Sequence, residues 1–128
     1  MDARKLALLC RKIADDKKAE NIVTLDVRKL STVTDFFVIM SATSEPHMRA
    51  IADEISEKVE IETGERPRAV DGTIRGNWVV MDYVDVIIHI MRSDTRQHYD
   101  LEGLWSDAPR LRGRKAATPR KKRTPAGR

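Results

Sequence analysis

The chain has 128 residues, which suits a single domain large enough for one apolar core. Its one cysteine, Cys10, excludes an intramolecular disulfide and a cysteine-based zinc site, and it fits a reducing, cytoplasmic compartment. No apolar run approaches the length of a membrane span, and the first residues lack the apolar segment of a signal peptide, so no membrane partner is expected.

Charge is divided unevenly along the chain. There are 24 Lys and Arg residues against 20 Asp and Glu residues, a formal net charge of +4. Nine of the basic residues and none of the acidic ones lie in 110–128, so residues 1–109 hold 15 basic and 20 acidic side chains, a net of −5. We therefore predict an acidic folded domain over 1–109 and a disordered basic tail over 110–128. The tail either contacts RNA phosphates or is a solubilising extension.

Helical spacing of apolar residues predicts two helices in the first half of the chain. In residues 2–18, Cys10 falls within the apolar stripe, so it is expected to be a buried core residue and not a catalytic thiol. A second helix is predicted over 45–63, between Ser44 as N-cap and Gly64 as C-terminal stop. Its buried stripe is expected to consist of Met48, Ile51, Ala52, Ile55 and Val59. An anion site at Ser44 is the second interpretation, because no glycine before Thr63 opens the backbone to a ligand.

Alternation and β-branched residues predict the strands. Residues 21–27 form a strand whose Val23, Leu25 and Val27 side faces the core, and 36–40 form a central strand buried on both faces. A short strand over 67–71, a hairpin and a last helix over 94–105 complete the order α-β-β-α-β-β-β-α. The expected fold is α/β, a single domain with a mixed sheet of about five strands flanked by helices.

The hairpin between Gly76 and Met91 carries the densest pattern. We expect its turn at Tyr83–Val84, with Asp82 opposite Asp85 and Trp78 opposite His89. Because side chains alternate along a strand, one face is then wholly apolar and consists of Val79, Met81, Val86, Ile88 and Ile90. The other face mixes aromatic, aliphatic and acidic side chains: Trp78, Val80, Asp82, Asp85, Ile87 and His89.

Such a mixed face suits the docking of a protein partner, since aromatic residues dominate interface energetics and charged rims orient the partner. The alternative is that helices cover it as a second core. The pattern alone gives these two interpretations equal weight.

The chemistry-bearing residues form no recognisable catalytic set. Asp82 and Asp85 could flank a magnesium ion, and a strand followed by a serine-containing turn and a helix is loosely similar to nucleotidyltransferases. However, the glycine–serine pair and the closely paired acids of those enzymes are absent. The three histidines, His47, His89 and His98, form no metal-binding pair. We expect no metal and no cofactor, and the nucleotidyltransferase-like enzyme is kept as the alternative.

Several short motifs, taken together and in order, resemble a known family. They are Thr43-Ser44 with His47, Ile51–Glu54, Asp71-Gly72, Trp78–His89, Tyr99–Glu102 and Leu104–Ala108. They are similar to the bacterial ribosomal silencing factors, also called Iojap-related, over about residues 3–109. The pattern W-x-x-x-D-Y-x-D-x-x-x-H at 78–89 and the pattern L-E-x-L-W-x-D-A at 101–108 are the most specific blocks.

The resemblance implies a translation repressor and not an enzyme, with a fold similar to nucleotidyltransferases. It implies binding to ribosomal protein fourteen of the large ribosomal subunit, a block to joining of the small subunit, notably under nutrient limitation, and a homodimer when free. Carried over by motif, the partner-binding residues are Trp78, Asp82, Tyr83, Asp85 and His89, and Val80 of the same mixed face is expected to bind with them. Outside the family core, a weak ribosomal RNA contact is expected from Arg120, Lys121, Lys122 and Arg123.

The sequence departs from the family pattern at three places. The family usually has glycine where Val84 stands, and a β-branched residue is unfavourable in a turn that needs a positive φ, so we expect a different turn type. It also favours glycine near Ala42, and Arg or Gln where Pro46 stands.

Overall fold

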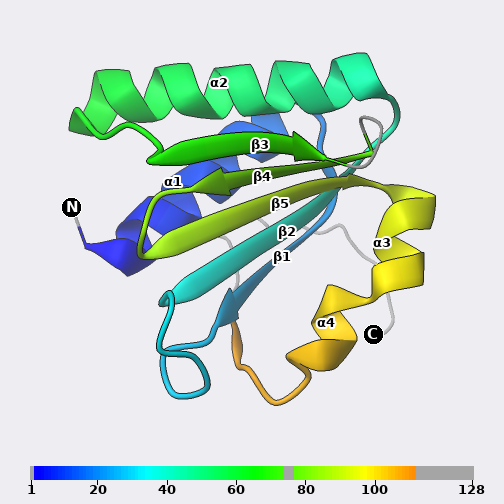
Figure 1. Cartoon of the computed structure of the whole chain (residues 1–128). Helices are drawn as coiled ribbons and strands as arrows, with labels where there is room; N and C mark the ends of the chain where they lie inside the picture. Colours follow the sequence, from blue (N-terminus) through cyan, green and yellow to red (C-terminus); the bar gives the residue numbers. More distant parts are fainter. Residues whose placement is uncertain (1, 74–76, 112–128) are drawn as a thin grey trace.

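The computed structural model of the chain describes residues 2–73 and 77–111 (Figure 1). In this part of the chain the helices are α1 (Ala3–Asp16), α2 (Glu45–Thr63), α3 (Ser93–Tyr99) and α4 (Leu101–Leu104). The strands are β1 (Glu20–Asp26), β2 (Phe36–Ala42), β3 (Ala69–Thr73), β4 (Trp78–Asp82), β5 (Val86–Arg92) and β6 (Arg110–Leu111). The predicted order is confirmed as far as β5.

The described strands form one mixed sheet in the order β3-β4-β5-β2-β1-β6. β2 and β5 run parallel, because α2 and the β3–β4 arm carry the chain back between them, and the other neighbours are antiparallel. The single α/β domain with a mixed sheet is confirmed, with six described strands where about five were expected. The additional strand, Arg110–Leu111, pairs with β1, so sheet pairing continues past the predicted boundary at residue 109.

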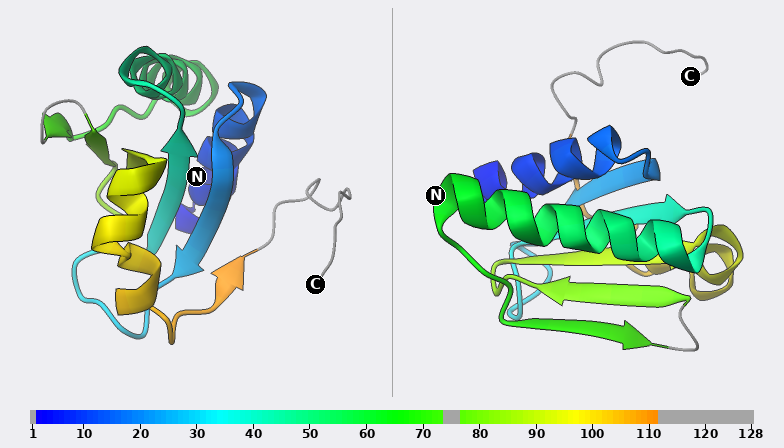
Figure 2. Two further views of the ribbon diagram at one scale, coloured as in Figure 1. Left: turned by 90° about the vertical axis from the view of Figure 1, so that its right-hand side faces the viewer. Right: turned by 90° about the horizontal axis from the view of Figure 1, so that it is seen from above.

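One face of the sheet packs against α1 and α2, which lie side by side over it (Figure 2). The bounds of α2 and its buried stripe are those predicted. The Ser44 hydroxyl accepts a hydrogen bond from the His47 amide at 3.2 Å, and Gly64 ends the helix at a φ of +78°. Cys10 is fully buried in this main core, and burial raises the pKa of its thiol to about 12. Its predicted role as a core residue is confirmed.

The predicted core side of β1 is confirmed, but it faces the smaller of two cores. Leu25 and Val27 are buried in this core, on the face of the sheet opposite α1 and α2, and Val23 packs against it. The side that faces the main core contains Thr24, which is fully buried although polar. Its hydroxyl accepts a hydrogen bond from Arg11 of α1 at 3.3 Å, which accounts for a polar residue there.

On the opposite face of the sheet, α3 and α4 cover only a part, as Figure 1 shows. The single helix predicted over 94–105 is wrong, because Asp100 adopts a φ of +45° and separates the two short helices. The Asp100 carboxylate then caps α4 by accepting from the Gly103 amide at 3.1 Å. Within the described residues, no helix is long and apolar enough to cross a membrane.

Candidate docking face

The β4–β5 hairpin turns one residue later than predicted. Tyr83 donates its amide to the Val86 carbonyl at 2.8 Å, so the two turn residues are Val84 and Asp85. The Asp85 amide donates to the Tyr83 carbonyl at 2.9 Å and closes a tight turn around Val84, whose φ is +76°. Val84 therefore adopts a positive φ, a conformation that glycine adopts readily and valine does not.

This turn displaces every predicted cross-strand pair by two residues. Val80 lies opposite His89 and Trp78 opposite Met91, where the sequence had suggested Trp78 opposite His89. A displacement by two preserves the alternation of side chains, so the division into an apolar and a mixed face is confirmed while the individual pairs are wrong. We call the mixed face, consisting of Trp78, Val80, Asp82, Ile87 and His89, the hairpin face.

Tyr83 does not belong to the hairpin face. Its side chain is 5% exposed and packs in the main core with Met81, two residues before it on the same side of the strand. Burial raises the pKa of its phenol above the usual value, and the hydroxyl is without a hydrogen-bond partner among the described residues. The expectation that Tyr83 shares the docking face is therefore wrong, since the later turn leaves it inside the strand alternation.

Trp78 and His89 form a polar contact within an aromatic group. The Trp78 Nε1–H donates to His89 Nδ1 at 3.1 Å, although the two residues are diagonal neighbours and not opposite one another. The indole also packs against Tyr99 of α3 at a centroid distance of 5.0 Å, and the imidazole and Phe37 rings form a T-shaped contact at 5.4 Å. Burial lowers the pKa of His89 to about 4, so its ring is neutral at pH 7 and can accept the indole proton at Nδ1.

Asp82 lies at the end of β4 with both carboxylate oxygens engaged. Oδ2 accepts from Arg68 Nη2 at 2.6 Å, and Oδ1 accepts from the Val84 amide at 2.7 Å. The Arg68 hydrogen bond holds the pKa of Asp82 below its usual value. Asp85 is exposed in the turn, and its carbonyl accepts from Asp35 and Phe36, both at 3.0 Å, which joins the turn to the start of β2.

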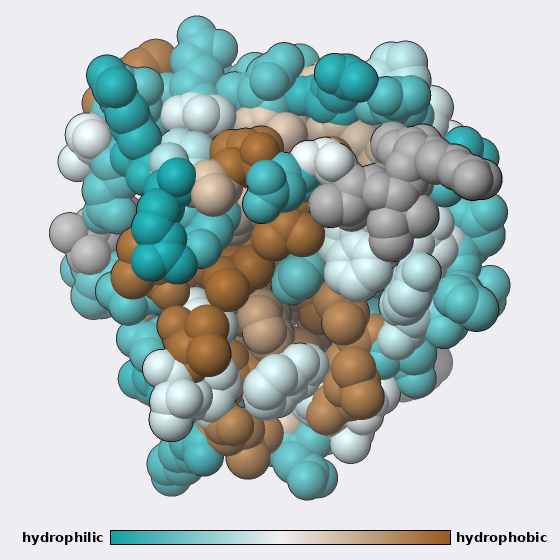
Figure 3. All heavy atoms as spheres, in the orientation of Figure 1, coloured by the Kyte–Doolittle hydropathy of each residue, from teal (hydrophilic) through white to brown (hydrophobic). Residues whose placement is uncertain are grey.

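The hairpin face is half covered by helices, as the second interpretation predicts for the whole face, and docking on the uncovered part stays a prediction. α3 covers Trp78 through Tyr99, and Trp105 packs against Phe37 at 5.2 Å. Val80 and Ile87 remain half-buried. Figure 3, in the orientation of Figure 1, shows apolar side chains gathered in the middle of this face with hydrophilic ones around them.

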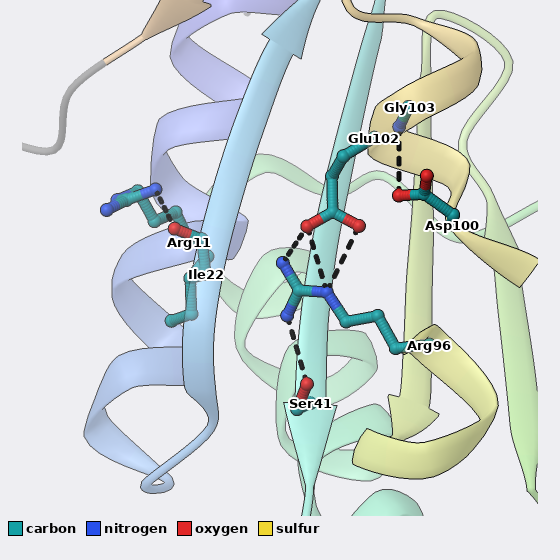
Figure 4. Close-up of polar contacts among 7 residues, drawn as sticks. All are labelled: Arg11, Ile22, Ser41, Arg96, Asp100, Glu102 and Gly103. Atoms are coloured by element: carbon teal, nitrogen blue, oxygen red, sulfur yellow. Dashed lines mark hydrogen bonds and ion pairs between the residues drawn. The ribbon is translucent and has the colours of Figure 1, made fainter. Parts of the chain in front are cut away.

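A partly buried ion pair joins the two covering helices (Figure 4). Arg96 of α3 donates to Glu102 at 2.7 Å and to the Ser41 hydroxyl of β2 at 3.0 Å. Burial pushes the pKa of Glu102 upward, but the hydrogen bonds and positive charge of Arg96 outweigh it, so the net pKa is lowered. Sequence reasoning missed this cluster, because 55 residues separate Ser41 from Arg96 and no local pattern joins them.

Two sequence predictions concern metal and RNA contacts. In residues 2–73 and 77–111, no group of three or more His, Cys, Asp or Glu side chains could hold a metal ion. The predicted RNA contacts Arg120, Lys121, Lys122 and Arg123 lie outside the described residues.

Comparison with known proteins gives consistent matches. The family model described as ribosomal silencing factor during starvation matches residues 1–128. The chain is 39% identical over 109 residues to a ribosomal silencing factor of Halalkalibacterium halodurans, covering 85% of this chain and 92% of the relative. It is 36% identical to the Bacillus subtilis factor over the same shares of both chains. It is 33% identical to the chloroplastic Iojap protein of Arabidopsis thaliana, over 86% of this chain and 46% of that protein.

Solved structures also match this fold. A crystal structure of a Chromobacterium violaceum protein has a TM-score of 0.78 at 28% identity, over 83% of this chain and 88% of that one. A second, from Bacillus halodurans, has a TM-score of 0.71 at 37% identity, over 85% and 98% of the two chains. The expected likeness to nucleotidyltransferases stays a prediction.

Proposed function

The chain belongs to the ribosomal silencing factor family, and from this premise we propose that it represses translation by binding the large ribosomal subunit. The match of the family model to residues 1–128 carries the proposal. A regulatory role without catalysis agrees with the names of the relatives, which describe silencing factors.

The proposed docking site is the uncovered part of the hairpin face. Val80 and Ile87 supply apolar area, Asp82 lies at its margin, and exposed Asp85 extends the acidic rim beyond it. Trp78 and His89 support this surface from the side covered by α3. An apolar centre with a charged rim is the usual anatomy of a specific protein interface.

The partner we propose is ribosomal protein fourteen of the large subunit, contacted through basic side chains that meet the acidic rim. Complementary charge of this kind speeds association and fixes orientation more than it adds affinity. The bound domain then occupies the surface where the small subunit joins, so repression is steric, and it operates when nutrients are limited. We propose a homodimer for the free protein, and a weak, salt-sensitive contact of the basic tail with ribosomal RNA.

Co-sedimentation with isolated large subunits tests the docking site. Val80→Glu introduces a charge into the centre of the face and is expected to weaken binding at least about tenfold, since central apolar contacts carry most interface energy. Ile61→Glu is the matched control: the same charge change is made on α2, where the side chain is 73% exposed, and binding should be unchanged. A chain ending at Leu111, which keeps β6, should still bind.

The outcome that would contradict the proposal is binding of Val80→Glu at the strength of the wild type, with both proteins folded by circular dichroism. Asp82→Asn is the second variant, for the case that Val80→Glu does not fold. Its side chain keeps the shape of aspartate and loses the charge, so weaker binding that is less sensitive to salt is expected.

A further inference from the structure

Asp82 is already paired with a guanidinium of its own chain. Arg68 precedes β3, and its amide donates to the Asp82 carbonyl at 2.6 Å, which places the two residues side by side across the β3–β4 ladder. The Arg68 side chain then folds back so that Nη2 donates to Asp82 Oδ2, also at 2.6 Å. The carboxylate at the margin of the proposed docking face therefore holds an arginine before any partner arrives.

The exposure of its arginine separates this pair from the structural ion pair of the same domain. The two carboxylates are similarly exposed, 21% for Asp82 and 22% for Glu102, but the Arg96 side chain is 9% exposed between α4 and β2 whereas the Arg68 side chain is 64% exposed. An exposed ion pair contributes little to folding, because water and salt screen it and both side chains lose freedom in forming it. The Arg68 guanidinium can thus leave Asp82 at little cost to the fold.

We propose that Arg68 is an intramolecular competitor, which occupies on Asp82 the position that a basic side chain of the ribosomal partner takes in the complex. The inference rests on the proposed function and adds a regulation to that site. Arg68 contacts the carboxylate through a single hydrogen bond to Oδ2, and Oδ1 is engaged by the Val84 amide. Each oxygen can accept a further hydrogen bond, but a second cationic side chain at the same carboxylate would lie close to the positive charge of Arg68. The two cations therefore compete for the charge of Asp82, and part of the binding free energy is spent on displacing Arg68.

The direction in which Arg68→Gln changes the affinity for large subunits tests whether Arg68 is a competitor. Arg68→Gln removes the competitor and is expected to strengthen binding to large subunits about two- to fivefold, the range that corresponds to an exposed ion pair. Loss of a positive charge should by itself weaken attraction to RNA-rich particles. A gain in affinity would therefore run against the general electrostatic trend.

Arg66→Gln is the matched control. Arg66 is also exposed and paired, with Glu60 of α2 at 2.9 Å, so its replacement changes net charge and ion-pair count equally without touching Asp82. We expect the Kd of Arg66→Gln to equal that of the wild type or to rise slightly. In an Asp82→Asn background, Arg68→Gln should have no further effect on the Kd, because the contested carboxylate is gone.

Binding of the four proteins and the wild type is measured at one fixed salt concentration, with thermal unfolding of each as the folding check. If Arg68→Gln binds no tighter than Arg66→Gln, while the wild type binds and Asp82→Asn binds more weakly, the competitor inference is overturned and the proposed function stands. If the wild type does not bind large subunits, the proposed function fails, and the inference fails with it.

Discussion

Replacing Val84 by glycine should make the protein more stable. Val84 has a φ of +76°, a conformation that costs an L-residue about 1–2 kcal/mol because its Cβ approaches the following carbonyl oxygen. Glycine adopts it freely, although glycine also loses about 0.5–1 kcal/mol more backbone entropy on folding than a residue with a side chain. The Val84 side chain is 47% exposed, so little apolar burial is lost.

The net expectation is a gain of about 0.5–1 kcal/mol in the free energy of unfolding. For a domain of this size that corresponds to a rise of about 3–5 °C in Tm. Urea unfolding at 25 °C and a thermal scan measure the two quantities, and agreement between fluorescence and circular dichroism checks that unfolding is two-state.

Val33→Gly is the control for this experiment. Val33 lies in the β1–β2 loop, is 74% exposed, and does not have a positive φ. The same substitution there should destabilise the protein by about 0.5–1 kcal/mol, because it only adds freedom to the unfolded chain. If Val84→Gly and Val33→Gly destabilise the protein equally, the strain at Val84 is refuted.

Two further predictions concern the half-covered face. Arg96→Met leaves Glu102 without its guanidinium and should cost about 2–4 kcal/mol in urea unfolding, and adding Glu102→Gln should recover part of this loss, because it removes the unpaired charge. Burial lowers the pKa of His89 from its ordinary value of 6.5 to about 4. His89 therefore contributes stability that is complete above pH 6.5 and is lost as the pH falls toward 4, by about 2–3 kcal/mol. His89→Asn, whose amide oxygen can replace Nδ1 as acceptor for Trp78, should lose correspondingly less stability over that pH range; an equal loss would refute the assignment.

The sequence predicted correctly those helices and strands whose bounds or burial are set by residues close to them in the chain. The bounds of α2 follow from a serine N-cap and a terminal glycine, each of which acts within one turn of the helix. The burial of β2 follows from a continuous apolar run. The two faces of the hairpin were also predictable, because alternation fixes them even when the register is displaced by two residues.

The missed features all depend on conformations or contacts that local pattern does not report. Val84 and Asp100 adopt positive φ values without being glycine, so the turn position and the break between α3 and α4 had no signal. β6 consists of two residues at the start of a basic segment and forms only because β1 offers an open edge. The pairing of Arg68 with Asp82 could be predicted only from the register between β3 and β4. The short strand predicted over 67–71 did not specify that register.

We propose that the protein occupies the joining surface of the large subunit through its hairpin face. Light scattering during the mixing of large and small subunits tests it most directly, with the large subunits first saturated with the wild type, Val80→Glu or Ile61→Glu. We expect the wild type and Ile61→Glu to reduce the joining amplitude, and Val80→Glu to leave it unchanged. Binding of the wild type to large subunits with no reduction in joining would contradict it.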